Sequence, residues 1–220
     1  MSLWPAISLS LQLAALSSAI LLLVATPLAW WLVTTRNRLR PVVEAVTALP
    51  LVLPPTVLGF YLLILFSPQT WLGRFWVQMT GETLAFSFTG LVLASVIYSL
   101  PFAVQPLRTA FQTVGFAPRE AAATLGANRW QIFYSVVVPL SKRGFLAATV
   151  LSFAHTLGEF GVVLMVGGNI PGKTRVISIE IYNRVEVLDY TATHFLAAGL
   201  LGFSFLVLAL VFLANKEATR

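Results

Sequence analysis

The chain has 220 residues, of which 58% are hydrophobic and only 10% are charged, with a formal net charge of +6. Ordinary soluble domains carry about 25% charged residues, so this composition excludes a water-soluble globular protein and indicates lipid as the surrounding solvent. The absence of cysteine excludes disulfides, thiolate nucleophiles and Cys-ligated metals. Because Lys and Arg form short clusters between apolar runs, we interpret the charge as a topology signal and not as a nucleic-acid-binding surface.

Five apolar stretches are long enough to cross a hydrocarbon core of roughly 30 Å. The first, 9–33, follows a charge-free N-terminal segment and precedes a basic cluster, whereas a cleavable signal peptide would begin with positive charge. The other four are 42–66, 85–107, 144–166 and 190–214. The sequence therefore predicts an all-α integral membrane protein of about five spans, with residues 1–220 forming one membrane domain.

The distribution of basic residues predicts the orientation of the spans. If the cluster of Arg36, Arg38 and Arg40 is cytoplasmic, most Lys and Arg lie on the cytoplasmic side and the outer segments are nearly neutral. The positive-inside rule then places the N-terminus outside and, with five spans, the C-terminus in the cytoplasm.

Prolines interrupt the second span. Pro50, Pro54 and Pro55 remove backbone donors, which in lipid is tolerable only if the freed carbonyls face other helices or a wet cavity. We hypothesise a broken helix that lines a passage, with Pro54 and Pro55 at the passage or its gate. A plain proline kink is the alternative.

The segment 116–143, between the third and fourth spans, is too polar at its start to cross the membrane. Glu120 and the three alanines that follow predict a short helix at the membrane surface. Gly126 is placed to end that helix in a left-handed conformation, and Asn128 is placed to cap a second helix that Pro139 ends.

Such a pair of helices suits the docking of another protein. The small alanines allow close approach, and Arg119, Glu120 and Arg129 offer charges around the contact. An amphipathic helix that rests on lipid headgroups is the alternative, although it would favour more Lys and Arg and a stronger apolar face.

The same residues resemble the EAA motif of binding-protein-dependent ABC importers, with Val136 and Val138 in place of the usual Ile and Leu. In that family the loop is a coupling helix that inserts into a cytoplasmic ATPase subunit and transmits its closure to the membrane helices. The resemblance therefore implies a MetI-like permease fold. It also assigns ATPase coupling to Arg119, Glu120, Ala121, Ala122, Gly126 and Pro139.

Two further segments resemble the permease subunits of molybdate importers: LPLVLPPTVLGFYLL and HTLGEFGVVLMVGGNIPGKTRVISIEIY. Sulfate permeases share the LGEFG stretch and remain an alternative, as does tungstate as the cargo. The resemblance implies a homodimer in the bacterial plasma (inner) membrane, with two cytoplasmic ATPase subunits and an external oxyanion-binding protein. It implies neither a cofactor nor enzyme activity in this chain, because ATP hydrolysis belongs to the separate subunit.

Gly167, Gly172, Lys173 and Thr174 have the spacing of a P-loop. A P-loop needs a strand, a helix and a parallel sheet to present its amides, whereas this copy follows a transmembrane span into an outer segment. We interpret it as a turn, with a membrane-bound P-loop enzyme as the alternative. Lys173 and Arg175 are candidates for contacts at the outer mouth, with the binding protein or the oxyanion.

His155 and Glu159 lie four residues apart within the fourth span, so they share one face of the predicted helix. Ionisable groups inside a membrane mark a pathway or pair with each other. We favour a structural role, in which Glu159 pairs with His155 or accepts backbone donors near a break at Gly158 and Gly161. A passage or gate role, or a proton-coupled secondary carrier, is the alternative. The two separated histidines of the chain cannot form a metal site alone.

Overall fold

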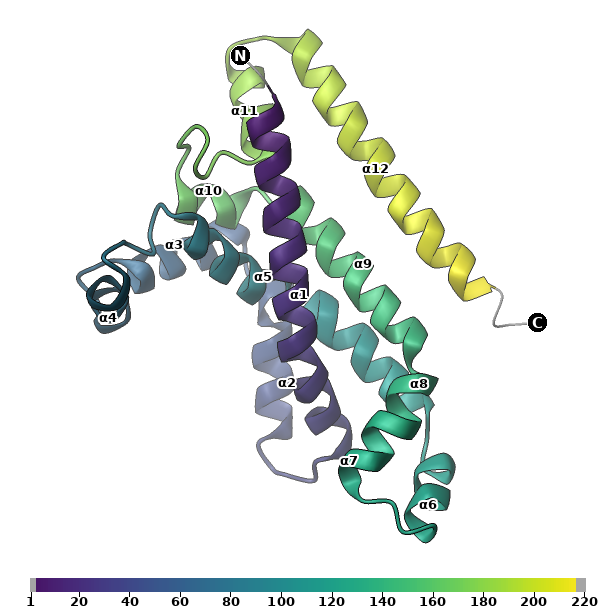
Figure 1. Cartoon of the computed structure of the whole chain (residues 1–220). Coiled ribbons are helices and arrows are strands. Elements are labelled where there is room, and N and C mark those ends of the chain that lie inside the picture. Colours follow the sequence, from purple (N-terminus) through teal and green to yellow (C-terminus); the bar gives the residue numbers. More distant parts are fainter. Residues whose placement is uncertain (1–2, 217–220) are drawn as a thin grey trace.

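Three helices pack against one another at the centre of the structure: α1 (Trp4–Thr34), α5 (Phe88–Thr113) and α9 (Lys142–Gly158) (Figure 1). The computed structural model describes residues 3–216, and every regular element within this range is helical. The predicted all-α fold is thus confirmed. The predicted position of the C-terminus falls on residues 217–220, which lie outside the described residues.

Small residues let the central helices approach closely. The fully buried alanines at their contacts are Ala25, Ala29, Ala103 and Ala148. Gly144 of α9 lies so near α5 that an added Cβ would be 2.2 Å from the Cβ of Ala110. In lipid there is no hydrophobic force between apolar helices, so close packing of this kind is what holds the bundle together.

The second predicted span is broken. It consists of α2 (Arg40–Ala48), a 3₁₀ turn (Leu49–Leu51) and α3 (Pro55–Phe66), and the two halves are bent by 109°. Pro54 is extended (φ −56°, ψ 135°), because a residue that precedes proline is disfavoured in the helical region. The predicted break is confirmed and is much sharper than a proline kink, so a continuous helix over 42–66 is wrong.

The fourth predicted span is also interrupted, at the break expected near Gly158 and Gly161, so 144–166 is not one continuous helix. α9 ends at Gly158, Glu159 is extended, and a separate short helix, α10 (Gly161–Gly167), packs against α3 and α5. The backbone N–H of Val162 donates to the Glu159 carboxylate at 2.7 Å. The carboxylate thereby satisfies a free donor at the start of α10, which favours a new helix over continuation of α9.

The last predicted span is confirmed as α12 (Tyr190–Lys216), which contacts α9 and α11. Over 190–209, most of its apolar side chains are exposed. By length and apolarity α1, α5 and α12 can each cross a membrane. Two bent pairs of helices, within 40–66 and within 129–158, raise the number to as many as five, in agreement with the predicted number of spans. Two helices in the connecting segments had not been predicted: α4 (Trp71–Thr80) and α11 (Ile177–Glu186).

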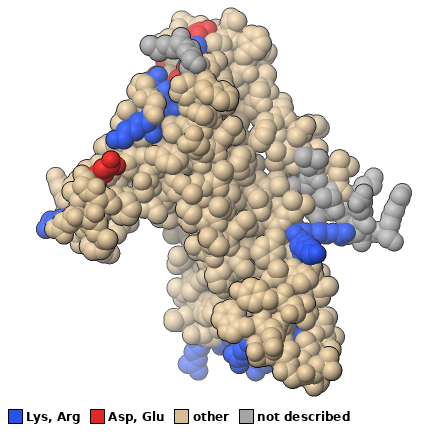
Figure 2. Space-filling model, viewed as in Figure 1, with Lys and Arg blue, Asp and Glu red and all other residues tan. Residues whose placement is uncertain are grey.

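The bundle has two ends that differ in charge. The end where α1 and α5 finish and the 116–143 loop folds is called the loop end, and the one where α11 and the first turns of α1 lie is called the opposite end (Figure 1). Figure 2 shows a largely uncharged surface over the middle of the molecule, basic side chains at the loop end, and a mixture of basic and acidic side chains towards the opposite end.

Candidate functional site

The 116–143 loop folds into the two short helices that the sequence predicted. α6 (Ala117–Thr124) has no buried residue, and Gly126 follows it with φ +85°. α7 (Arg129–Ile132) begins with a capping box, in which Asn128 and Gln131 exchange side-chain to backbone hydrogen bonds. The left-handed glycine and the Asn cap therefore lie where local sequence rules placed them.

The second helical segment ends next to Pro139, as predicted, but it is not a regular α-helix throughout. α7 continues through a π-helical turn (Phe133–Val137) into α8 (Val138–Leu140), which ends one residue after the proline. The wide π turn already interrupts the regular ladder of hydrogen bonds, so the missing N–H of Pro139 costs little there. The chain then bends by 72° at Ser141 into α9.

The outer face of the loop combines apolar side chains with charge. Phe116, Leu125 and Trp130 are 74%, 89% and 72% exposed, and Glu120 lies exposed between them on α6. Exposed apolar groups rimmed by polar ones are typical of protein contact surfaces. The exposed residues of the predicted coupling set are Glu120, Ala121, Gly126 and Pro139.

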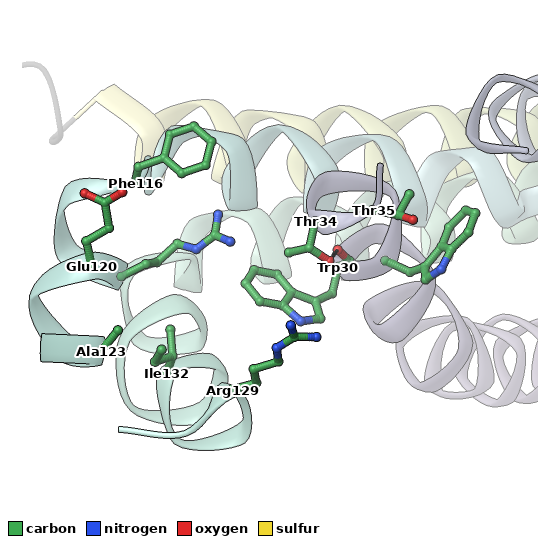
Figure 3. Close-up of a pocket in the computed structure, with 10 residues that line it drawn as sticks. Trp30, Thr34, Thr35, Phe116, Glu120, Ala123, Arg129 and Ile132 are labelled. Atoms are coloured by element: carbon green, nitrogen blue, oxygen red, sulfur yellow. Dashed lines mark hydrogen bonds between the residues drawn. The ribbon is translucent and has the colours of Figure 1, made fainter. Parts of the chain in front are cut away.

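Arg119, by contrast, turns inward. Its guanidinium lies 4.9 Å from the ring centroid of Trp30 and 5.4 Å from that of Phe116, both cation–π distances. It lines a cavity of about 550 Å³ between the end of α1 and the loop. Figure 3 shows Glu120 and Arg129 on the loop side of this cavity and Trp30 on the α1 side.

Aromatic rings join the loop to the central helices. The ring of Trp30 is 5.2 Å from that of Phe133 and 5.9 Å from that of Phe111, so α1, α5 and the π turn meet at one cluster. Sequence reasoning missed this cluster. The available signal was the pair Trp30 and Trp31 near the end of the first span. Aromatic residues at such a position are usually interpreted as anchors at the membrane interface and not as core contacts.

His155 and Glu159 do not pair, since no ion pair joins them in the part of the chain that the structure describes. His155 Nδ1 lies 2.9 Å from Ser99 Oγ on α5, and its ring stacks on Phe102 at 3.8 Å between centroids. Glu159 accepts the Val162 N–H. Of the two structural roles expected for Glu159, pairing with His155 or accepting backbone donors near the break, the structure therefore shows the second. The two residues thus act in separate contacts.

The P-loop-like segment forms a turn. Thr174 is fully buried; its hydroxyl donates to the carbonyl of Gly167 at 2.7 Å and accepts the Ile170 N–H at 3.1 Å. A P-loop would instead use this hydroxyl for a metal ion and would follow a strand, and residues 3–216 contain no strand.

Replacing Thr174 by Val is expected to loosen this turn. The change leaves a buried carbonyl and a backbone N–H without a partner, which costs about 1–3 kcal/mol. We expect a lower apparent melting temperature in detergent and faster proteolysis at 168–175. Thr89→Val, the same change at an exposed position of α5, is the control. Equal melting temperatures and proteolysis rates in the two variants would contradict the role of the Thr174 hydroxyl.

Lys173 and Arg175, the two cations of the same segment, differ in whether their charge has a partner. Arg175 Nε donates to Asn169 Oδ1 at 2.6 Å, and its Nη1 lies 3.6 Å from Glu180. Lys173 is exposed and forms no ion pair among the described residues. Of the two residues predicted at the outer mouth, only Lys173 therefore has a charge without an ion-pair partner among the described residues.

Residues 22–217 match the family described as "Binding-protein-dependent transport system inner membrane component". The chain is 54% identical over 211 residues to the molybdenum transport system permease protein of Azotobacter vinelandii, covering 96% of this chain and 93% of that protein. It is 34% identical over 195 residues to the sulfate transport system permease protein of Synechocystis sp., covering 89% of this chain and 68% of that protein.

The fold is also similar to a solved structure of the MetNI methionine ABC transporter in an inward-facing conformation. The TM-score is 0.75 over 99% of this chain and 96% of that chain, at 16% sequence identity, so this similarity concerns the fold alone. The MetI-like architecture that the EAA motif implied is confirmed. With the family match over residues 22–217, these findings show that the chain belongs to the inner membrane components of binding-protein-dependent transport systems.

Proposed function

We propose that this chain is the permease subunit of an ATP-driven importer and that its cargo is molybdate. The observation that carries the proposal is the 54% identity to a molybdenum permease along 96% of the chain, against 34% for a sulfate permease. Tungstate has the same charge and shape as molybdate and would use the same path.

The proposed partners follow from the two ends of the bundle. Two cytoplasmic ATPase subunits dock on the 116–143 loops of a homodimer, where α6 has no buried residue. An oxyanion-binding protein docks at the opposite end, where Lys173 is exposed. Lipid surrounds the bundle, and most apolar side chains of α12 over 190–209 are exposed to it.

The charges support an orientation with the N-terminus outside and the C-terminus in the cytoplasm. The loop end carries the basic cluster at Arg36 and Arg38, both exposed. At the opposite end Arg184 is paired with Glu180 and Asp189, at 2.9 Å and 2.7 Å. An excess of cations on one side and neutralised charge on the other is the pattern of the positive-inside rule.

The aromatic contacts of the loop couple the ATPase subunits to the membrane helices. Closure of the ATPase subunits displaces α6 and α7, and the cluster of Trp30, Phe111 and Phe133 transmits the displacement to α1 and α5. The break at Pro54 and Pro55 lets α3 move separately from α2. Energy is required, because bringing a dianion into a negative interior costs about 5 kcal/mol per 100 mV.

Transport by the reconstituted complex tests the proposal. In proteoliposomes that contain the permease and its ATPase, with the binding protein outside, molybdate uptake is expected to require both ATP and the binding protein. Sulfate uptake should be lower by roughly tenfold or more, which corresponds to a preference for molybdate of about 1.4 kcal/mol or more. Uptake driven by a proton gradient without ATP would indicate a secondary carrier, and preferential sulfate uptake would indicate a sulfate permease.

A further inference from the structure

A polar strip runs along the loop-end half of α5, apart from the site residues described above. Gln105, Arg108, Thr109 and Gln112 occupy positions i, i+3, i+4 and i+7, so they share one face of the helix. Gln105, Thr109 and Gln112 are exposed. Polar groups on a membrane-spanning helix are costly in contact with lipid, so this face must meet water or protein.

Arg108 on this strip is held by an acidic residue of α2. Glu44 Oε1 lies 2.8 Å from Arg40 Nε and 3.0 Å from Arg108 Nη2, so one carboxylate serves two guanidinium groups. The cluster therefore has a net charge of +1. The Nε of Arg108 is buried and has no hydrogen-bond partner in the described chain. Since a guanidinium has five N–H donors, Arg108 retains donors for another acceptor.

These groups surround a cavity of about 300 Å³ between α2 and α5. Its polar lining consists of Glu44, Thr47, Gln105, Arg108, Thr109 and Gln112. A water molecule occupies about 30 Å³ of liquid, so the cavity has room for a four-oxygen anion with part of its hydration shell. Guanidinium, amide and hydroxyl donors around one space are the groups that oxyanions bind.

We propose that Arg108 binds the oxyanion at the loop end of the translocation path, immediately before its release. The inference rests on the proposed function and names a residue in the path that carries the anion. Glu44 has a positioning role: it holds the guanidinium against α2, and its negative charge weakens the attraction for a dianion. Transport requires binding that is favourable enough for entry and weak enough for exit, which a net charge of +1 provides.

The alternative is that Arg108 and Glu44 only fasten α2 to α5. The two possibilities predict different effects of the Glu44→Gln substitution. A fastening pair loses stability whichever partner is neutralised. An anion site with Glu44 neutralised gains attraction for the dianion, so the oxyanion binds more tightly and leaves more slowly.

Two measurements on the permease–ATPase complex test the inference. The first is ATP-driven molybdate uptake in proteoliposomes, where Arg108→Gln is expected to reduce the rate by about tenfold or more, and Arg108→Lys to an intermediate degree, because Lys keeps the charge but loses the fork of donors. Binding-protein-stimulated ATP hydrolysis should persist in both variants. Arg36→Gln removes the same charge from an exposed position at the same end and should leave uptake unchanged.

The second measurement is equilibrium binding of radiolabelled molybdate to the complex in nanodiscs without the binding protein. Glu44→Gln is expected to tighten binding by roughly threefold or more, as expected when one opposing charge is removed, and Arg108→Gln to abolish it. Unchanged uptake in Arg108→Gln, or weaker binding in Glu44→Gln, would overturn the inference. A wild-type complex that imports no oxyanion would instead overturn the proposed function. If Arg108→Gln fails to fold, Arg108→Lys and Glu44→Gln still decide.

Discussion

Charge reversal at Glu120 combined with a bulky residue at Gly126 is expected to reduce ATP-driven uptake by at least roughly thirtyfold, the equivalent of losing one contact worth about 2 kcal/mol at a protein interface. Glu120 is exposed on α6, where a lysine would reverse the charge offered to the ATPase. Gly126 has φ +85° and no atom within 4 Å of an added Cβ, so valine there alters the turn and not the packing. The left-handed conformation costs an L-residue about 1–2 kcal/mol.

Uptake and co-purification of the ATPase from solubilised membranes measure this effect in the Glu120→Lys, Gly126→Val double variant. The variant is expected to reach the membrane in normal amounts, because α6 buries none of its side chains. Glu82→Lys is the matched control: it is the same charge reversal at an exposed position between α4 and α5, outside the loop, and it should transport normally. Normal uptake and normal ATPase association in the double variant would show that the loop does not couple the two subunits.

The spans and the loop could be predicted from the sequence because lipid imposes a simple rule. A segment in contact with hydrocarbon must satisfy its backbone internally and present apolar side chains, which leaves long apolar runs in the sequence. Capping is equally local: Asn128 and Gly126 determine the ends of short helices through contacts within a few residues. Elements governed by such rules were therefore found where they were expected.

The breaks were harder to place because they depend on single groups. A hydropathy average over 144–166 remains high although Glu159 lies inside it. Gly158 and Gly161 indicate a break there, but the sequence leaves open whether Glu159 pairs with His155 or accepts backbone donors, and the structure shows that its carboxylate accepts the Val162 N–H. Pro139 marks the end of the second loop helix to within one residue, but the sequence does not predict the π turn (Phe133–Val137) that precedes it. A hydropathy average does not show the role of a single carboxylate such as that of Glu159. Local capping rules do not predict an irregular element such as the π turn.

The partners of charged residues could not be predicted at all. Arg119 is adjacent in sequence to Glu120, yet it stacks on Trp30 of α1 while Glu120 is exposed. Arg108 was predicted only as one of many cytoplasmic cations, whereas its contact with Glu44 of α2 gives it a distinct environment. Such pairings arise from helix packing between distant segments, which residue type and spacing along one helix do not determine.

Enlarging Gly144 is expected to disrupt the central packing of the bundle. An added Cβ would lie 2.2 Å from the Cβ of Ala110 and 3.2 Å from the carbonyl oxygen of Pro106, whereas carbon atoms pack best at about 3.5–4.0 Å. Overpacking of this kind costs about 1–3 kcal/mol, which in a chain of this size lowers the melting temperature by about 2–12 °C. Thermal unfolding of the purified Gly144→Ala variant in detergent measures the change. Gly144→Val should lower the melting temperature further.

A reciprocal exchange separates packing from other effects of the substitution. In the double variant Gly144→Ala, Ala110→Gly the new methyl group occupies the space that the old one leaves, so most of the lost stability should return. Gly199→Ala in α12 is the control, because nothing lies within 4 Å of its added Cβ. Since alanine favours a helix by up to about 1 kcal/mol over glycine, this control should be neutral or stabilising. If the exchange fails to restore stability while Gly199→Ala is neutral, the contact between α5 and α9 is not what limits the size of residue 144.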